Sequence, residues 1–205
     1  MKAFTLPTLR IVVLAAGFSA RLGKPKALAR VRGSTLIERT VGLLAPFARS
    51  SKIIVVIPPG AARYRIGSHA RSVAFIANPT RTAGLSSSVR RGITQARYSA
   101  AVLLLPVDLA DLQRRDIARL IARWRGARRS VVARWVQARA GTPLILPRWL
   151  YARALGVAGD RGLRDLVRGL PNDAVSLVML PSAESDVDTV RDLERARRRV
   201  RPRNS

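Results

Sequence analysis

The chain has 205 residues, of which 48% are hydrophobic and 24% charged, a composition typical of a globular domain and not of long disorder. It has no cysteine and a single histidine, His69. This excludes disulfides, thiolate metal sites, histidine-based metal clusters and catalysis by a Ser-His or Cys-His pair. Four of its 38 basic residues are lysines, so 34 are arginines, and the net charge is +26.

The large excess of arginine allows two interpretations. Either it reflects an arginine-rich composition on a solvated surface, or the protein binds an anionic partner such as phosphates, a nucleic acid or a membrane face. The arginines are scattered over almost every segment, which favours the first. Yet Glu38 is the only acid before Asp108, and a half so poor in carboxylates suits binding of a polyanion. No apolar run reaches the ~18 residues that a membrane span needs, and we expect a cytoplasmic protein.

Strands and helices are expected to alternate from the N-terminus onward. Residues 9–16 form a continuous apolar run, as in a strand buried on both faces, and residues 17–26 form a polar loop. An extended piece at 28–31 and a turn lead to a helix that Ser34 caps and that ends near Phe47. The next elements are two strands, a helix with a serine-rich start and the most apolar strand, at residues 52–57, 72–77, 86–98 and 100–107.

The second half mixes shorter elements. A helix at 112–124 is followed by strands at 130–136 and 143–146, which flank a hairpin or turn. The remaining elements are short helices at 147–155 and 162–170, a strand at 174–180 and a basic helix at 190–200. Residues 1–200 are expected to form a single domain, and residues 201–205 a disordered basic tail.

Four buried strands separated by crossovers predict an α/β fold with a doubly wound, mostly parallel (mixed) sheet. Ligands of such sheets bind at the carboxyl ends of the strands. This rule places the loop at residues 17–26 and Asp108, which follows the strand at 100–107, at the same edge of the sheet.

The first motif follows the first strand and reads L-A-A-G-F-S-A-R-L-G-K-P-K, at residues 14–26. Its small residues, Ala15, Ala16 and Gly17, let a ligand approach the backbone closely, and the amides of such a loop can form an anion nest. Arg21 and Lys26 add two cations. The pattern therefore indicates a phosphate-binding loop, although an ordinary basic connection between a strand and a helix would also fit.

Three further motifs each allow a functional and a structural interpretation. Asp108, directly after a buried strand, suits a Mg²⁺ ligand or a turn residue before the next helix. Gly84 and the three serines that follow Leu85 open a helix whose start can hold an anion or can simply be capped. Asp186 and Asp188 precede the last helix and suit metal binding, but Asp188 or Thr189 could equally cap that helix.

Taken together, these motifs resemble the MobA-like nucleotidyltransferases, and within them the molybdenum cofactor cytidylyltransferases. The matching segments occur in the family's order and span residues 9–193. They are residues 14–26, Asn78 with residues 84–88 (G-L-S-S-S), Asp108, Gly141-Thr142-Pro143, residues 159–164 (G-D-R-G-L-R) and residues 186–189 (D-V-D-T) with Asp192-Leu193.

The resemblance implies a Rossmann variant like that of nucleotide-diphospho-sugar transferases, with Mg²⁺ as cofactor. It implies that Arg21, Lys26 and Asp108 are catalytic and that Asp108 and Asp188 hold the metal. The residues implied for nucleotide binding are Leu14, Ala15, Ala16, Gly17, Arg21, Lys26, Asn78, Gly84, Ser86 and Ser87. Those implied for the acceptor are Ser88, Gly141, Pro143, Asp160, Gly162 and Arg164.

Two positions point to cytidine. The family's guanylyl branch usually has two glycines where this chain has Ala16-Gly17, and Asp-Lys where it has Pro25-Lys26. We therefore expect CMP transfer from CTP to the phosphate of molybdopterin, with a molybdoenzyme or its chaperone as a further partner. The alternative is the same reaction from GTP, on molybdopterin or another phosphorylated acceptor.

One departure from the family pattern is Ala110, which stands where a proline usually follows the metal-binding aspartate. It affects the expected shape of the loop after Asp108. The alternative from a different class is a basic nucleic-acid-binding module. Such a module would need a localised basic stripe with stacking aromatics, and an aromatic content of 5% argues against it.

Overall fold

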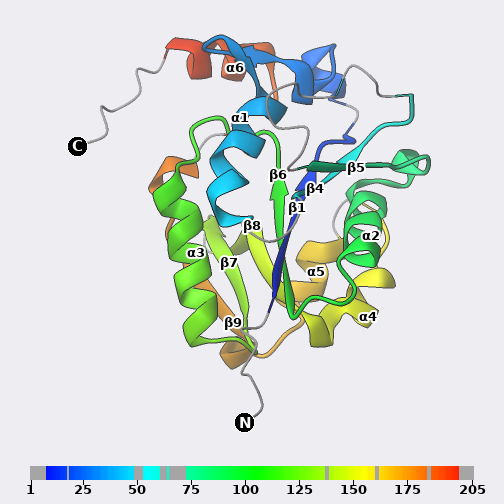
Figure 1. The fold of residues 1–205 in the computed structure, drawn as a ribbon, viewed down its shortest axis with the longest axis vertical. Helices are drawn as coiled ribbons and strands as arrows, with labels where there is room; N and C mark the ends of the chain where they lie inside the picture. Colours follow the sequence, from blue (N-terminus) through cyan, green and yellow to red (C-terminus); the bar gives the residue numbers. More distant parts are fainter. Residues whose placement is uncertain are drawn as a thin grey trace.

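The computed structural model describes residues 8–17, 19–48, 53–60, 64, 73–136, 139–159, 162–183 and 186–198. Its main feature is a seven-stranded sheet in the order β5-β4-β1-β6-β8-β7-β9 (Figure 1). The strands are β1 Leu9–Leu14, β4 Ile53–Ile57, β5 Val73–Ala77, β6 Ala101–Pro106, β7 Val131–Val136, β8 Arg139–Pro147 and β9 Val175–Val178. A small two-stranded sheet pairs β2, Arg30–Val31, with β3, Ser34–Thr35.

The main sheet is mostly parallel, as predicted. β1 runs parallel to β4 and β6, β4 to β5, and β7 to β9. Only β8 runs against its neighbours, β6 and β7, which makes the sheet mixed. The carboxyl ends of β1 and β6 consequently lie side by side, so the first loop and Asp108 share one edge.

Helices cover both faces of the sheet. They are α1 Leu36–Leu44, α2 Leu85–Gln95, α3 Arg114–Gly126, α4 Tyr151–Leu155, α5 Gly162–Arg168 and α6 Val190–Arg198. Successive side chains of β1 serve opposite faces, as strand geometry requires: Val13 packs with the apolar residues of α1 and α3, and Val12 with those of α2, α4 and α5. Both valines are fully buried, which explains why the strand reads as a continuous apolar run.

Besides the two hydrophobic cores on the faces of the sheet, a third and smaller hydrophobic cluster lies above its carboxyl edge. There α6 packs against the segment that contains β2 (Figure 1). Leu193 and Ala196 of α6 pack there with Val31 of β2 and Leu36 at the start of α1. The C-terminal helix is thereby fixed beside the loop that follows β1.

Two local predictions were wrong. Thr35, not Ser34, caps α1: its hydroxyl accepts a hydrogen bond from the Glu38 amide, and the Glu38 carboxylate accepts one from the Thr35 amide. This Thr-x-x-Glu capping box satisfies two amides at once, and Ser34 instead pairs with Val31 in the small sheet. The extended piece expected at 28–31 is strand only over β2, because Lys26–Leu28 forms a 3-10 turn.

The hairpin expected near residue 140 is present as the antiparallel pair β7 and β8, while its tip, residues 137–138, lies outside the described residues. His69 and the basic tail also lie outside them. Among the residues that the structure describes, no helix has the length and apolar character needed to cross a membrane.

Candidate active site

The loop after β1 folds back on itself. The Ala15 amide donates a 2.8 Å hydrogen bond to the Val56 carbonyl, which continues the pairing with β4 for one residue. The Ser19 hydroxyl then accepts a 2.9 Å hydrogen bond from the Lys26 amide. This contact closes the loop and brings Lys26 back to the end of the sheet, beside Asp108.

Lys26 links two aspartates that are far apart in the sequence. Its ammonium nitrogen lies 3.1 Å from Asp108 Oδ2 and 2.5 Å from Asp188 Oδ1. Arg21 Nη2 lies 3.0 Å from the other oxygen of Asp188. The structure thus brings together all four residues predicted to be catalytic or metal-binding, here called the Lys26 cluster: Arg21, Lys26, Asp108 and Asp188.

The aspartates of the Lys26 cluster stabilise the positive charge of Lys26. Burial alone would lower the pKa of Lys26, but the charge of Asp108 and the hydrogen bonds to Asp188 and Asp108 outweigh it, so the pKa is raised. Lys26 therefore carries a full positive charge at neutral pH. The side chain of Arg21, in contrast, is 72% exposed and open to a ligand.

The segment from Asp186 to Thr189 reaches the cluster through its backbone. The Val187 amide donates a 2.9 Å hydrogen bond to the Asp108 carbonyl, and the Val187 side chain is buried in the third cluster. Thr189 caps α6, because its hydroxyl accepts from the Asp192 amide and the Asp192 carboxylate accepts from the Thr189 amide. Capping therefore falls to Thr189, and the Asp188 carboxylate faces Lys26.

The two carboxylates fit a divalent cation that arrives with phosphates. Asp108 Oδ1 is buried and has no hydrogen-bond partner among the described residues, so a ligand oxygen is available. Within the same residues, no group of three or more histidine, cysteine, aspartate or glutamate side chains could hold a metal. Mg²⁺ is commonly bound by one or two carboxylates, substrate phosphates and water, which matches this donor set.

Asn78 organises the start of α2. It is fully buried, and its amide nitrogen donates to the hydroxyls of Ser87 at 2.8 Å and Ser88 at 3.0 Å. Its side-chain oxygen accepts from the Thr80 amide. These contacts use the polar atoms of Asn78 within the protein, whereas the buried hydroxyl of Ser86 has no partner among the described residues.

The described residues predicted for the acceptor lie on three elements: Ser88 on α2, and the others on β8 and α5. Gly141 pairs with Arg134 across the hairpin, and Pro143 follows it on β8. Gly162 and Arg164 belong to α5, while Asp160 lies outside the described residues. The Ser86 amide donates to the Gly159 carbonyl, which brings the segment before α5 beside α2. In the described part of the chain, none of these residues bonds to the Lys26 cluster.

One charged residue near the site was missed from the sequence. Arg134, in β7, is 5% exposed and its guanidinium lies 3.5 Å from Asp186 Oδ1. Burial raises the pKa of Asp186, the charge of Asp108 adds to this, and Arg134 opposes it. The available signal was an arginine inside the apolar strand V-V-A-R-W-V.

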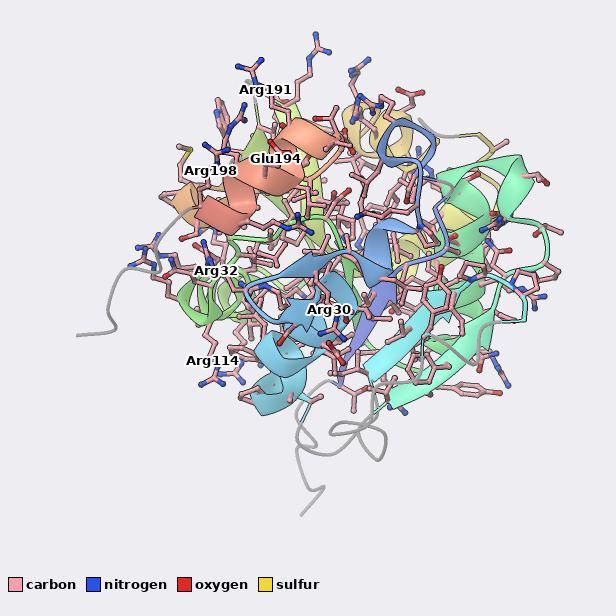
Figure 2. All side chains as sticks on the ribbon, turned by 90° about the horizontal axis from the view of Figure 1, so that it is seen from above. Arg30, Arg32, Arg114, Arg191, Glu194 and Arg198 are labelled. Carbon is pink, nitrogen blue, oxygen red and sulfur yellow. The ribbon has the colours of Figure 1, made fainter. Side chains whose placement is uncertain are left out.

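Arginines surround the carboxyl edge of the sheet. Figure 2, seen from above, shows Arg191 and Arg198 on α6, Arg30 and Arg32 around the β2–β3 turn and Arg114 at the start of α3. Positive charge around a site raises the local concentration of anionic ligands. This distribution suits a substrate that carries several phosphates.

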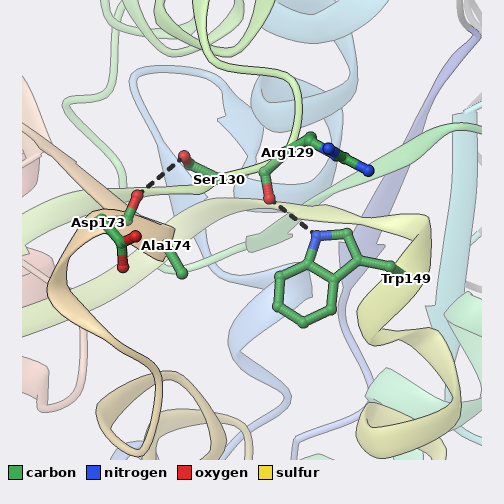
Figure 3. Close-up of a pocket in the computed structure, with 5 residues that line it drawn as sticks. All are labelled: Arg129, Ser130, Trp149, Asp173 and Ala174. Atoms are coloured by element: carbon green, nitrogen blue, oxygen red, sulfur yellow. Dashed lines mark hydrogen bonds between the residues drawn. The ribbon is translucent and has the colours of Figure 1, made fainter.

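A pocket of about 370 Å³ lies at the opposite edge, lined by Arg129, Ser130, Trp149, Asp173 and Ala174 (Figure 3). These residues stand before β7, after β8 and before β9, at the amino ends of the parallel strands. The Trp149 indole donates to the Arg129 carbonyl, and the Ser130 hydroxyl to that of Asp173. The pocket is therefore separate from the Lys26 cluster.

Solved structures with the same fold include that of Rv0371c from Mycobacterium tuberculosis H37Rv, with a TM-score of 0.75 and 24% identity over 94% of this chain and 100% of that one. Its complex with manganese gives a TM-score of 0.71 and 23% identity, over 94% and 99% of the two chains. The 2-C-methyl-D-erythritol 4-phosphate cytidylyltransferase of Thermus thermophilus gives 0.67 and 22%, over 92% and 96%.

Sequence comparison gives the family. The bifunctional IPC transferase and DIPP synthase of Rubrobacter xylanophilus is 40% identical over an alignment of 84 residues, which covers 38% of this chain and 19% of that protein. The chain thus spans about a fifth of the length of this curated relative. The family model of the MobA-like NTP transferase domain matches residues 11–175. Because this match covers most of the chain, the protein belongs to the MobA-like NTP transferase domain family.

Proposed function

We propose that this protein is a nucleotidyltransferase that transfers CMP from CTP to the terminal phosphate of molybdopterin and releases pyrophosphate. The observation that carries the proposal is the convergence of Arg21, Lys26, Asp108 and Asp188 at the carboxyl edge of the sheet. Two cations suit a triphosphate, and two carboxylates suit the metal that accompanies it. The resemblance of the motifs to the cytidylyltransferases of the family supports the choice of CTP and molybdopterin.

The reaction needs no general base. A phosphate monoester has a second pKa of about 6, so it is already an anionic nucleophile at neutral pH. One of its oxygens forms a bond to the α-phosphorus of CTP, and the bond from that phosphorus to the oxygen bridging to the β-phosphate breaks. Pyrophosphate leaves with the electron pair, and no proton has to move. This agrees with a chain that has one histidine and no cysteine.

The protein's own task is to position and neutralise charge. Arg21 and Lys26 bind the triphosphate and stabilise the charge that grows on the departing pyrophosphate. Asp108 and Asp188 would hold Mg²⁺, which would polarise the α-phosphate. The raised pKa keeps Lys26 protonated, as this role requires.

Gly17 supports close approach of the nucleotide to the loop. A side-chain carbon at Gly17 would meet no protein atom within 4 Å, so the fold itself does not require glycine there. Contact with the base and ribose of the nucleotide would account for it. The same loop contains Ala16 and Pro25, the two residues that differ from the guanylyl branch of the family and favour cytidine over guanosine.

The test is turnover with molybdopterin and Mg²⁺, measured separately with each of the four α-labelled ribonucleoside triphosphates. We expect label transfer from CTP with the highest kcat/KM. Faster transfer from GTP would replace the proposal by guanylyl transfer, and no transfer from any triphosphate would refute molybdopterin as the acceptor.

The same assay tests Asp108. Asp108→Asn should abolish turnover while CTP binding largely survives, and Asp173→Asn, at the opposite edge of the sheet, should behave as wild type. Near-normal activity of Asp108→Asn would show that its proposed metal role is wrong.

The proposal also includes a cytoplasmic location and a molybdoenzyme, or its chaperone, as the protein that receives the product.

A further inference from the structure

Arg134 is a buried cation whose charge is only partly compensated. Its side chain is 6% exposed, and among the described residues its single polar partner is Asp186, at 3.5 Å. A guanidinium has five N–H donors, and a buried charge is costly unless it is well paired. One long contact to a carboxylate that is 51% exposed leaves most of this donor capacity unused.

The order of the strands places Arg134 across the site from the triphosphate-binding loop. Asp108 follows β6, which lies between β1 on one side and β8 and β7 on the other. Arg21 and Lys26 approach Asp108 and Asp188 from the β1 side, whereas Arg134 approaches Asp186 from the β7 side. In the strand order, the cations that pair with the carboxylates of residues 108, 186 and 188 thus come from both sides of β6, the strand that Asp108 follows.

The geometry of in-line transfer at phosphorus suggests a role for a cation on the β7 side of the site. The attacking and leaving oxygens stand on opposite sides of the α-phosphorus. If Arg21 and Lys26 hold the departing pyrophosphate, the acceptor must approach from the other side, past three carboxylates that repel a phosphate dianion. A cation is needed on that path, and arginine pairs with phosphate through two parallel hydrogen bonds.

We propose that Arg134 binds the anionic phosphate of the acceptor and holds it opposite the triphosphate. This inference rests on the proposed function, because it needs a phosphorylated acceptor. Arg134 stands directly across the hairpin from Gly141, in the segment whose resemblance indicates acceptor binding. Asp186 holds the guanidinium in the free protein, and the acceptor phosphate takes its place.

The first experiment compares Arg134→Met with Arg139→Met, which removes an exposed arginine from the neighbouring strand β8. Turnover with CTP and molybdopterin is measured for both variants. Arg134→Met should lower kcat/KM for molybdopterin about 10- to 100-fold, the scale of one lost hydrogen bond to a charged group, and leave the Kd for CTP within about twofold. Arg139→Met should match wild type in both. Equal kcat/KM for molybdopterin in Arg134→Met and wild type would overturn the inference.

Asp186→Asn separates ligand binding from a purely structural ion pair. If Arg134 serves only to pair with Asp186, both variants lose the same interaction and should behave alike. If it binds the acceptor, Asp186→Asn frees the guanidinium and should keep or increase the affinity for molybdopterin. A loss equal to that of Arg134→Met would contradict the inference.

A measurement of phosphate binding tests the role of Arg134 independently of whether molybdopterin is the acceptor. Inorganic phosphate is titrated into the CTP-bound protein and followed by ³¹P NMR. Wild type should bind it and Arg134→Met should not, whether or not molybdopterin is a substrate. Absence of turnover with molybdopterin would therefore count against the proposed function, whereas equal phosphate binding by the two proteins, or none by wild type, would count against the role of Arg134.

Discussion

The backbone amide of Val187 donates a 2.9 Å hydrogen bond to the backbone carbonyl of Asp108, although the two residues belong to opposite ends of the second half of the chain. The Val187 side chain is 1% exposed and packs with Leu22 and Leu193. Main-chain bonding and apolar packing therefore hold Asp188 beside Asp108, in addition to the shared contact with Lys26. The two carboxylates should keep their relation when the lysine side chain is removed.

Lys26→Met tests the competition between the ammonium group and a metal ion. Without the lysine, the charges of Asp108 and Asp188 are no longer neutralised, and their repulsion favours a divalent cation. We expect the nucleotide-free variant to bind Mn²⁺ about tenfold more tightly than wild type and to lose turnover. Electron paramagnetic resonance of free Mn²⁺ measures this affinity. Lys24→Met, an exposed change in the same loop, is the control, and unchanged affinity in Lys26→Met would speak against the competition.

Gly17→Ala should separate folding from nucleotide binding. The added methyl group meets no protein atom within 4 Å, so the free energy of unfolding should stay within about 1 kcal/mol of wild type. The same methyl group would obstruct a nucleotide lying against the loop and should weaken CTP binding at least about tenfold. Urea denaturation and CTP titration give the two quantities. Gly126→Ala, at the end of α3 and equally free of contacts, should change neither, and normal CTP affinity of Gly17→Ala would refute the close approach.

The hydrogen bonds that cap α6 should make the free energy of unfolding depend on pH. Hydrogen bonds from the hydroxyl and amide of Thr189 lower the pKa of Asp192 below its usual 3.8. A lowered folded-state pKa contributes stability that is present above the unfolded value and is lost as the pH falls through the folded value. In Asp192→Asn, the unfolding free energy should therefore decline less between about pH 5 and pH 3. A pH slope for Asp192→Asn that is parallel to that of wild type would contradict the assignment.

Gly92→Ala tests the packing of α2 on the sheet. A side-chain carbon at Gly92 would overlap Cγ1 of Val12, which is fully buried in β1. Such overpacking typically costs about 1–3 kcal/mol of stability. Denaturant unfolding should show a loss of this size for Gly92→Ala and a much smaller change for Gly156→Ala, whose added carbon makes only ordinary contacts. Equal stability of Gly92→Ala and wild type would mean that α2 does not lie against Val12 as described.

Much of the fold could be predicted because buried parallel strands leave a clear trace. The apolar runs around Val12, Val55 and Leu104 each became a central strand of the sheet. The sequence could not choose the residue that caps the last helix, since Asp188 and Thr189 are both good caps. Only the backbone bond of Val187 to Asp108, together with the Thr189–Asp192 capping box, decides it.

The remaining site geometry depended on tertiary contacts that periodicity does not encode. The cap of α1, in contrast, is a local matter: Thr35, unlike Ser34, is followed three residues later by a glutamate, so Thr35 forms the capping box. Arg134 stood out in the sequence as an arginine inside an apolar strand, but a single charge in such a strand does not reveal where its guanidinium points. The hydrogen bonds from Asn78 to Ser87 and Ser88 could not be foreseen from the sequence either, and the expected place of Asn78 at the nucleotide stays a prediction.

The most direct test of the account is the number of Mn²⁺ ions bound per protein in the presence of CTP, compared among wild type, Asp108→Asn, Asp188→Asn and the Asp173→Asn control. If the two carboxylates share one cation, wild type and Asp173→Asn should bind this Mn²⁺ ion, and Asp108→Asn and Asp188→Asn should each lose most of its binding. Wild-type Mn²⁺ binding by either Asp108→Asn or Asp188→Asn would contradict a shared metal site at the Lys26 cluster.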